Sequence, residues 1–474
     1  VELFRRALEL KPDFHLVYNN LGNTLRDLGR SEEAVECYRE VFRHEVRDLS
    51  TLSHVLVSMH QFSFDDHDTL YEMHCSLGGK LTALGGDRPL RRQTVCARAN
   101  GKIRLGYVSP RFSREIVGNF FLPVFDAHDR DKFEIYLYSA TRRTDDLTEY
   151  FSRHADKWTD ACGMSDNALC RAIVEDEIDI LIDLAGHAPE NRLAAIARKP
   201  APVQLAMIDY FDTTGIEAMD YYLTDHYSTP DGGKQRFVER LLYQDQPRLV
   251  YRAPDYAPEP RIRDADAGGI VFGSFNRHQK IIPQVVELWS QLLLAVPDAT
   301  LLLKNTAFAF DEVQENYLAR FEQHGVSRER IRFRGKSPHA EMLAEYGEID
   351  IALDTFPYNG GLTTCEALWM GTPVLALEGE RIISRQSAAM LESVGLGSFV
   401  AHSATEFVEI GRHWATRREE LCALRRGLRQ AMAESPLTDA GSYTAQLERH
   451  LQRIWSEYLD QRGAAKRAAI DSGA

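Results

Sequence analysis

Two successive series of short apolar segments, with helical stretches between them, constrain the fold of this chain most. Each segment is short enough for a buried strand, and the alternation of strands with helices is typical of a parallel sheet. A segment rich in Pro, Asp and Ala at 253–269 separates the two series. The predicted strands are 103–108, 133–138, 178–184, 203–208 and 221–223 in the first series, and 270–275, 300–303, 331–333, 349–353 and 374–377 in the second.

This pattern predicts an α/β protein with two Rossmann-like domains. Ligands of such sheets bind outside the carboxyl ends of the strands, and two facing domains place the site in the cleft between them. The predicted domains are a repeat segment at 1–47, a helical connector at 48–98, Rossmann-like domains at 99–255 and 256–436, and a C-terminal helix (437–458) and tail within 437–474.

The repeat segment shows self-similarity at a fixed period. Glu2-Leu-Phe-Arg5 recurs as Glu36-Cys-Tyr-Arg39, and the shift from position 2 to position 36 is the 34-residue tetratricopeptide period. Gly22 stands where such a repeat places a small residue. Because about three repeats are usually needed for stability, and the chain opens without Met, we expect further repeats upstream.

Composition excludes several classes of protein. Apolar residues make up 44% and charged residues 27%, as in soluble globular proteins, and the net charge of −14 argues against nucleic acid as the main partner. The seven scattered cysteines lack C-x-x-C spacing, which favours free thiols in a reducing, cytoplasmic setting and predicts no zinc site. No apolar run is long enough to span a membrane, and the given sequence predicts no signal peptide. The acidic run 65–68 is interpreted as an exposed helix start, so no metal is assigned.

The segment 349–374 combines a strand, a glycine-bearing loop and a helix. The apolar run 349–353 leads into Asp354, the Gly360-Gly361 pair breaks the chain, and a helix is predicted over 363–370. Free N–H groups and the helix dipole at such a helix start bind anions such as a pyrophosphate. Glu366 lies about one turn into the helix, where it could accept hydrogen bonds from a ribose. An ordinary strand-to-helix turn that binds nothing has the same local pattern.

Several motifs together resemble glycosyltransferase family 41, the protein O-GlcNAc transferases and the SPINDLY-type O-fucosyltransferases. The chain over roughly 101–458 is identified as a member of that family. The similar stretches are Lys102 to Pro110, Asp183-Leu-Ala-Gly-His187 with Arg198 to Gln204, Thr213-Thr-Gly215 with Met219-Asp-Tyr221, Phe272-Gly-Ser-Phe-Asn276 with Lys280, and Asp354 to Val374.

The resemblance implies a GT-B fold and a role for each matching residue. Lys280 is expected to contact the diphosphate of the donor, where a cation stabilises the leaving group. The residues expected to bind the donor are Asn276, Lys280, His339, Gly360, Gly361, Leu362, Thr363 and Glu366. The residues expected near the acceptor and the sugar are His187, Tyr210, Thr213 and Thr214.

Three departures from the family pattern concern the sugar and base positions. Where many members have a His after the first strand, this chain has Glu115, which could act as a base if burial raised its pKa. Lys280 and Glu115 are therefore the candidate catalytic residues. Asp209 and Phe211 replace a Gly and a Pro, and Leu362 replaces a loop threonine. The donor sugar is thus left open.

The same residues bear on stereochemistry. Many retaining GT-B enzymes carry a glutamate eight residues before a glutamate like Glu366, and this chain has Tyr358 there. The predicted function is an inverting, metal-independent protein O-glycosyltransferase without a cofactor, which moves GlcNAc from UDP-GlcNAc to Ser or Thr of proteins recruited by the repeats. The alternatives are transfer of fucose from GDP-fucose, transfer of another bacterial sugar, and an inactive scaffold. Association of identical chains is left open.

Overall fold

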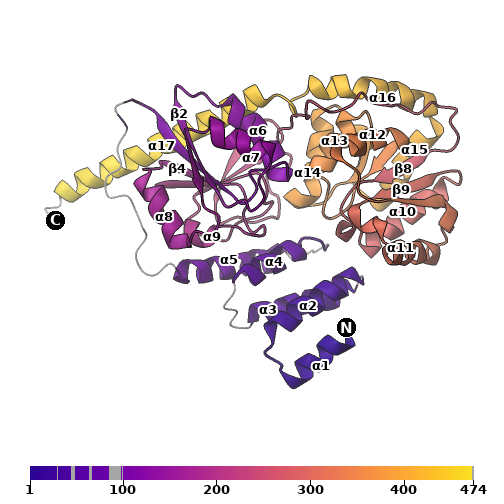
Figure 1. Cartoon of the computed structure of the whole chain (residues 1–474), viewed down its shortest axis with the longest axis horizontal. Coiled ribbons are helices and arrows are strands. Elements are labelled where there is room, and N and C mark those ends of the chain that lie inside the picture. The colour runs from indigo at the N-terminus through magenta and orange to yellow at the C-terminus, as the bar shows by residue number, and fades with distance from the viewer. Residues whose placement is uncertain (29, 44–48, 63–66, 85–97, 99, 472–474) are drawn as a thin grey trace. The chain divides into compact units, whose positions relative to one another are not determined.

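The computed structural model describes residues 1–471 except positions 29, 44–48, 63–66, 85–97 and 99 (Figure 1). The chain forms two compact units. Unit 1 comprises Val1–Glu40, Ser58–Ser63 and Ala253–Asp439, and unit 2 comprises Val41–Val57, Phe64–Arg252 and Ala440–Ala474. Each of the two units is built around one parallel sheet.

Unit 2 contains a seven-stranded parallel sheet in the order β3-β2-β1-β4-β5-β6-β7. The order reverses between β1 and β4, as in doubly wound folds. Its strands are β1 (Ile103–Ser109), β2 (Phe133–Ser139), β3 (Lys157–Asp160), β4 (Ile180–Asp183), β5 (Val203–Ala206), β6 (Tyr221–Asp225) and β7 (Arg240–Gln244). Its helices include α6 (Ile116–Ala127), α7 (Asp146–His154), α8 (Asp166–Glu175) and α9 (Leu193–Ile196).

Unit 1 contains a six-stranded parallel sheet in the order β10-β9-β8-β11-β12-β13. Its strands are β8 (Val271–Ser274), β9 (Thr300–Lys304), β10 (Ile331–Arg334), β11 (Ile351–Leu353), β12 (Val374–Leu377) and β13 (Val400–Ala401). Helices cover the sheet (Figure 1). They are α10 (Pro283–Ala295), α11 (Asp311–Gln323), α12 (His339–Glu345), α13 (Leu362–Trp369), α14 (Ile382–Ser393), α15 (Ala404–Thr416) and α16 (Arg418–Ala433).

The N-terminal repeat is helical, as predicted. It consists of α1 (Glu2–Leu10), α2 (His15–Asp27) and α3 (Ser31–Arg43). Gly22 of α2 packs against Tyr38 of α3 so closely that a Cβ at position 22 would lie 2.7 Å from the ring. The hydroxyl of Tyr38 donates to Asn23 Oδ1 at 2.8 Å. Only glycine at position 22 permits this approach between the two helices.

The predicted connector at 48–98 contains α4 (Leu49–Met59) and α5 (His67–Leu84). Part of the acidic run at 65–68 lies outside the described residues, and α5 begins at His67. The predicted C-terminal helix at 437–458 begins at Ala440 and continues to Asp471 as α17. It packs against α6 and β7 of unit 2, burying Leu447, Leu451 and Ile454.

All ten strands predicted from the apolar segments are present, whereas β3, β7 and β13 were not expected. These three lie at sheet edges. An edge strand is covered less completely, and β3 and β7 expose several side chains, so the apolar signal in their sequences is weak.

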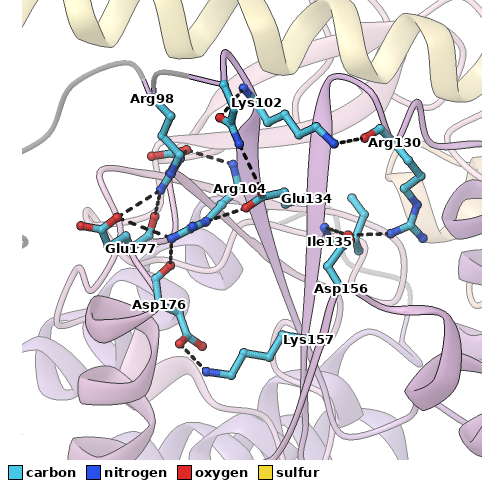
Figure 2. A network of polar contacts seen from close by, with 12 residues as sticks. Arg98, Lys102, Arg104, Arg130, Glu134, Ile135, Asp156, Lys157, Asp176 and Glu177 are labelled. Atoms are coloured by element: carbon cyan, nitrogen blue, oxygen red, sulfur yellow. Dashed lines mark hydrogen bonds and ion pairs between the residues drawn. The ribbon is translucent and has the colours of Figure 1, made fainter.

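Charged side chains form ion pairs and hydrogen bonds at the amino ends of β1 and β2 in unit 2 (Figure 2). The guanidinium of Arg98 pairs with the buried Asp179, which also accepts the backbone N–H of Arg104 at 2.9 Å. Arg104 Nε in turn donates to Glu134 at 2.7 Å. These contacts hold the entry to β1 at the edge opposite the strands' carboxyl ends.

Candidate functional site

The loop between β11 and α13 closes around the side chain of Asp354. This residue directly follows β11 and is 1% exposed. Its Oδ1 accepts hydrogen bonds from the backbone N–H of Thr355 at 2.9 Å and of Gly360 at 2.7 Å. The amide Nδ2 of Asn359 donates to Thr355 O at 2.8 Å. The loop therefore folds back on itself and leads directly into α13.

The start of α13 presents backbone donors. Within the described residues, the N–H groups of Gly361, Leu362 and Thr363 donate to no acceptor. The hydroxyl of Thr363 donates to Asn276 Oδ1 at 3.2 Å, which ties the loop after β8 to this helix. Free N–H groups at the positive end of a helix dipole are suited to bind an anion such as a phosphate group.

Lys280 places a cation beside the same loop. It ends a short 3₁₀ helix (His278–Lys280) that follows β8. Its Nζ donates to Asn359 O at 2.7 Å and lies 4.0 Å from the centre of the Tyr358 ring. Burial lowers the pKa of Lys280 to about 7, against the opposing attraction of Asp354. A bound diphosphate would add negative charge beside the amine and favour its protonated form.

Glu366 and His339 contact each other. Glu366 is 3% exposed, and its Oε1 lies 2.8 Å from His339 Nε2. The other ring nitrogen of His339 lies 2.8 Å from the hydroxyl of Tyr256. Burial raises the pKa of Glu366, whereas His339 opposes the rise. His339 is the more exposed member of the pair.

The structure brings all the predicted donor-binding residues together in unit 1. They follow β8, β10 and β11, at the carboxyl edge of the sheet where ligands of such folds bind. They are Asn276, Lys280, His339, Gly360, Gly361, Leu362, Thr363 and Glu366.

The residues predicted near the acceptor and the sugar lie in unit 2, in its interior. His187 is fully buried between Ser53 Oγ, 3.0 Å from Nδ1, and Thr214 O, 2.9 Å from Nε2. Burial lowers the pKa of His187 to about 3, so the ring is neutral. The hydroxyl of Tyr210 lies 2.7 Å from His74 Nε2. These side chains are engaged in hydrogen bonds within the unit.

Thr213 and Thr214 share one partner. Their hydroxyls donate to the two carboxylate oxygens of Glu239, at 2.6 Å and 2.5 Å. All three residues are buried. The shared carboxylate holds this turn in place.

Glu115 stands apart from these buried groups. It is the residue before α6, its side chain is 54% exposed, and its nearest cation is Arg111 at 3.9 Å. The hypothesis of a base at this position depended on burial raising the pKa of the carboxyl group. Glu115 lacks that burial.

Sequence reasoning did not assign a role to Asp354 or Asn359. Both are 1% exposed, and both hold the shape of the loop. A signal was available: an acidic residue directly after a buried parallel strand lies at the edge where ligands bind. The contact of Asp354 with Gly360, six positions downstream, depends on the conformation of the loop. The sequence pattern does not specify that conformation.

Comparison with known proteins agrees with this geometry. The profile of glycosyl transferase family 41 matches residues 54–251 and 263–447, which include both sheets. The chain belongs to glycosyl transferase family 41. A tetratricopeptide repeat profile matches residues 3–36, which confirms the predicted repeat.

Relatives within the family come from plants and bacteria. The chain is 34% identical over 419 residues to the probable UDP-N-acetylglucosamine–peptide N-acetylglucosaminyltransferase SPINDLY of Petunia hybrida, covering 85% of this chain and 44% of the relative. It is 28% identical over 407 residues to the Arabidopsis thaliana protein SEC, which carries the same enzyme name, covering 81% of this chain and 40% of that one. The chain thus spans less than half the length of these curated relatives.

A solved structure matches over nearly the whole chain. A mutant of the O-GlcNAc transferase from Thermobaculum terrenum superposes with a TM-score of 0.87 at 33% identity, covering 97% of this chain and 88% of that one. This match confirms the predicted α/β fold with two parallel sheets and an N-terminal helical repeat. In addition, no helix among the described residues is long and apolar enough to cross a membrane.

Proposed function

We propose that this chain is a protein O-glycosyltransferase that transfers GlcNAc from UDP-GlcNAc to Ser or Thr hydroxyls. The observation that carries the proposal is the loop of unit 1, where Lys280 and the free N–H groups at the start of α13 converge. Membership of the family and the names of its relatives support the donor.

The proposed reaction is a direct displacement with inversion. The acceptor hydroxyl oxygen forms a bond to the anomeric carbon, and the bond from that carbon to the diphosphate breaks. The hydroxyl proton passes to water or to an oxygen of the departing diphosphate. Negative charge grows on the departing diphosphate. Lys280 and the α13 N–H groups would stabilise that charge more strongly as the bond breaks, which is the condition for lowering the barrier. These groups supply positive charge without a metal.

The repeat gives the proposed enzyme a way to bind protein acceptors. Stacked helical repeats form extended binding surfaces in other proteins. The matched repeat at 3–36 would contribute to such a surface, and protein acceptors are the proposed partners.

GDP-fucose is the competing donor. Glu366 occupies the position where SPINDLY-like sequences carry Glu, and that residue motivates the alternative. Calorimetric titration with UDP and with GDP separates the two, because the base must be recognised in either case. Binding of UDP alone supports the GlcNAc donor, and binding of GDP alone would reassign the donor.

Transfer itself is tested by incubating the protein with nucleotide sugars and a cell lysate and mapping modified peptides by mass spectrometry. We expect transfer by the wild type and by Lys336→Met, a matched change at an exposed lysine of unit 1, and none by Lys280→Met. No transfer from any donor by the wild type would reject the enzymatic proposal in favour of a scaffold.

A further inference from the structure

Asp354 is buried, and Lys280 is half-buried. The two side chains carry opposite charges but do not form an ion pair. Lys280 Nζ donates a hydrogen bond to Asn359 O instead. Asp354 Oδ1 accepts two backbone N–H groups and, at 3.3 Å, the side-chain amide of Asn276, while within the described residues the buried Oδ2 accepts no hydrogen bond. The hydroxyl of Ser387, beside this carboxylate, donates to Gly360 O at 3.0 Å.

The two groups are linked through the loop rather than through direct contact. Asp354 fixes Gly360, and the neighbouring Asn359 supplies the carbonyl that holds Lys280. The charged groups near Lys280 are Asp354 from the end of β11 and Arg277 from its own segment. The centre of the Tyr358 ring lies 4.0 Å from Lys280 Nζ. The position of the lysine and its charge thus both depend on one carboxylate.

We propose that Asp354 is a positioning residue for Lys280, and that Lys280 takes up a proton when a nucleoside diphosphate binds. This inference rests on the proposed function of the site as a diphosphate site. Burial raises the pKa of Asp354, whereas the N–H groups of Gly360 and Thr355 that donate to its Oδ1, at 2.7 Å and 2.9 Å, favour its ionised form. Burial lowers the pKa of Lys280 to about 7, so Lys280 is the member that we expect to titrate near neutral pH. Arrival of the diphosphate places negative charge beside the amine and favours its protonated form.

The wild type gives the first test. With the pKa of Lys280 at about 7 in the empty site, roughly nine tenths of the amines are neutral at pH 8. Titrating UDP or GDP at pH 8 in two buffers of different ionisation enthalpy should therefore show uptake of about 0.9 proton per ligand bound. Affinity should fall on the order of tenfold between pH 6 and pH 8. Lys280→Met should abolish the uptake, which separates it from titration of the ligand's own terminal phosphate.

Asp354→Asn tests the positioning role. Asparagine keeps the shape and one acceptor oxygen but removes the charge, so the amine loses its attractive neighbour. We expect the pH at which affinity falls to move below that of the wild type. A purely structural role would weaken binding equally at every pH and leave that midpoint unchanged. Asp354→Glu, which retains the charge, should keep the midpoint near the wild-type value, and it is the control for the change in side-chain shape. If Asp354→Asn does not fold, the same shift is sought in Asn359→Asp, which adds a negative charge beside the amine and should move the midpoint above the wild-type value.

The outcomes separate this inference from the proposed function. Failure of both nucleotides to bind at any pH would reject the diphosphate site and the inference with it. Tight binding without proton uptake at pH 8 would overturn the inference alone. An unshifted midpoint in a folded Asp354→Asn protein would overturn the positioning role of Asp354.

Discussion

Gly360 sits where the β11–α13 loop is most crowded, and replacing it with alanine should damage unit 1. A Cβ at position 360 would lie 2.5 Å from Thr364 Oγ1, 2.7 Å from Thr363 Oγ1 and 3.0 Å from Asp354 Oδ1. Its φ is outside the left-handed region, so strain in the backbone does not contribute. The expected effect comes from crowding alone.

The size of the effect follows from what holds those three atoms. Thr364 Oγ1 is hydrogen-bonded to Ser387 Oγ at 3.0 Å, and Thr363 Oγ1 donates to Asn276 at 3.2 Å. Moving both hydroxyls away from a methyl group breaks hydrogen bonds worth about 1 kcal/mol each. Inserting a methyl into a packed site costs about 1–3 kcal/mol. We expect Gly360→Ala to lower the free energy of unfolding by about 3–5 kcal/mol.

Gly427→Ala is the matched control in the same unit. Gly427 lies on the exposed side of α16, and a Cβ there meets no atom within 4 Å. Both changes reduce the freedom of the unfolded chain to the same extent, so that contribution cancels in the comparison. Gly427→Ala should stabilise the protein by about 1 kcal/mol, because alanine has the higher helix propensity.

Urea denaturation followed by tryptophan fluorescence measures the difference. Three of the five tryptophans lie in unit 1: Trp289, Trp369 and Trp414. A Gly360→Ala protein within about 0.5 kcal/mol of the wild type, the ordinary range for a surface change, would refute the account of the loop.

Three further outcomes are expected. Arg425→Met should lower the free energy of unfolding by about 3 kcal/mol in urea, because it leaves the buried Asp350, now 2.9 Å from the guanidinium, with one fewer cation. In the unfolded chain His187 binds a proton below about pH 6.5, whereas in the folded protein its pKa is about 3 and the ring stays neutral. The free energy of unfolding therefore falls as the pH decreases below about 6.5. Urea denaturation at pH 7.5 and pH 5.5 should show a loss of about 1.4 kcal/mol from this group, which is missing in His187→Gln. Lys280→Met should lower kcat by about 10² to 10³, whereas the exposed Glu115→Gln should change it little; the opposite result in a peptide transfer assay would reverse both roles.

The sequence patterns that identified the fold depend on burial. Strands covered on both faces, such as 180–183, appear as uninterrupted apolar runs, and these were predicted. The edge strand 157–160 has partly exposed side chains and was not. The strand, loop and helix of the segment 349–374 were predicted because glycines and a helix start are local features.

The partners of the site residues were harder to predict because they come from distant segments. His339 and Glu366 were both expected near the donor, but their hydrogen bond joins residues 27 positions apart. The exposure of Glu115 likewise depends on how α6 packs. Neither can be read from a local pattern.

The C-terminal helix α17 has a consequence for how the chain is made. Its buried face belongs to unit 2, where Tyr443 donates to Arg248 O at 2.8 Å and Glu448 lies 2.9 Å from His128 Nδ1. These residues leave the ribosome after both sheets have been synthesised. The core of unit 2 can therefore be completed only after the sheet of unit 1 has also been synthesised, because α17 comes last in the chain. A nascent chain that stops near residue 439 would lack α17 and would expose the apolar surface of α6 and β7 to chaperones.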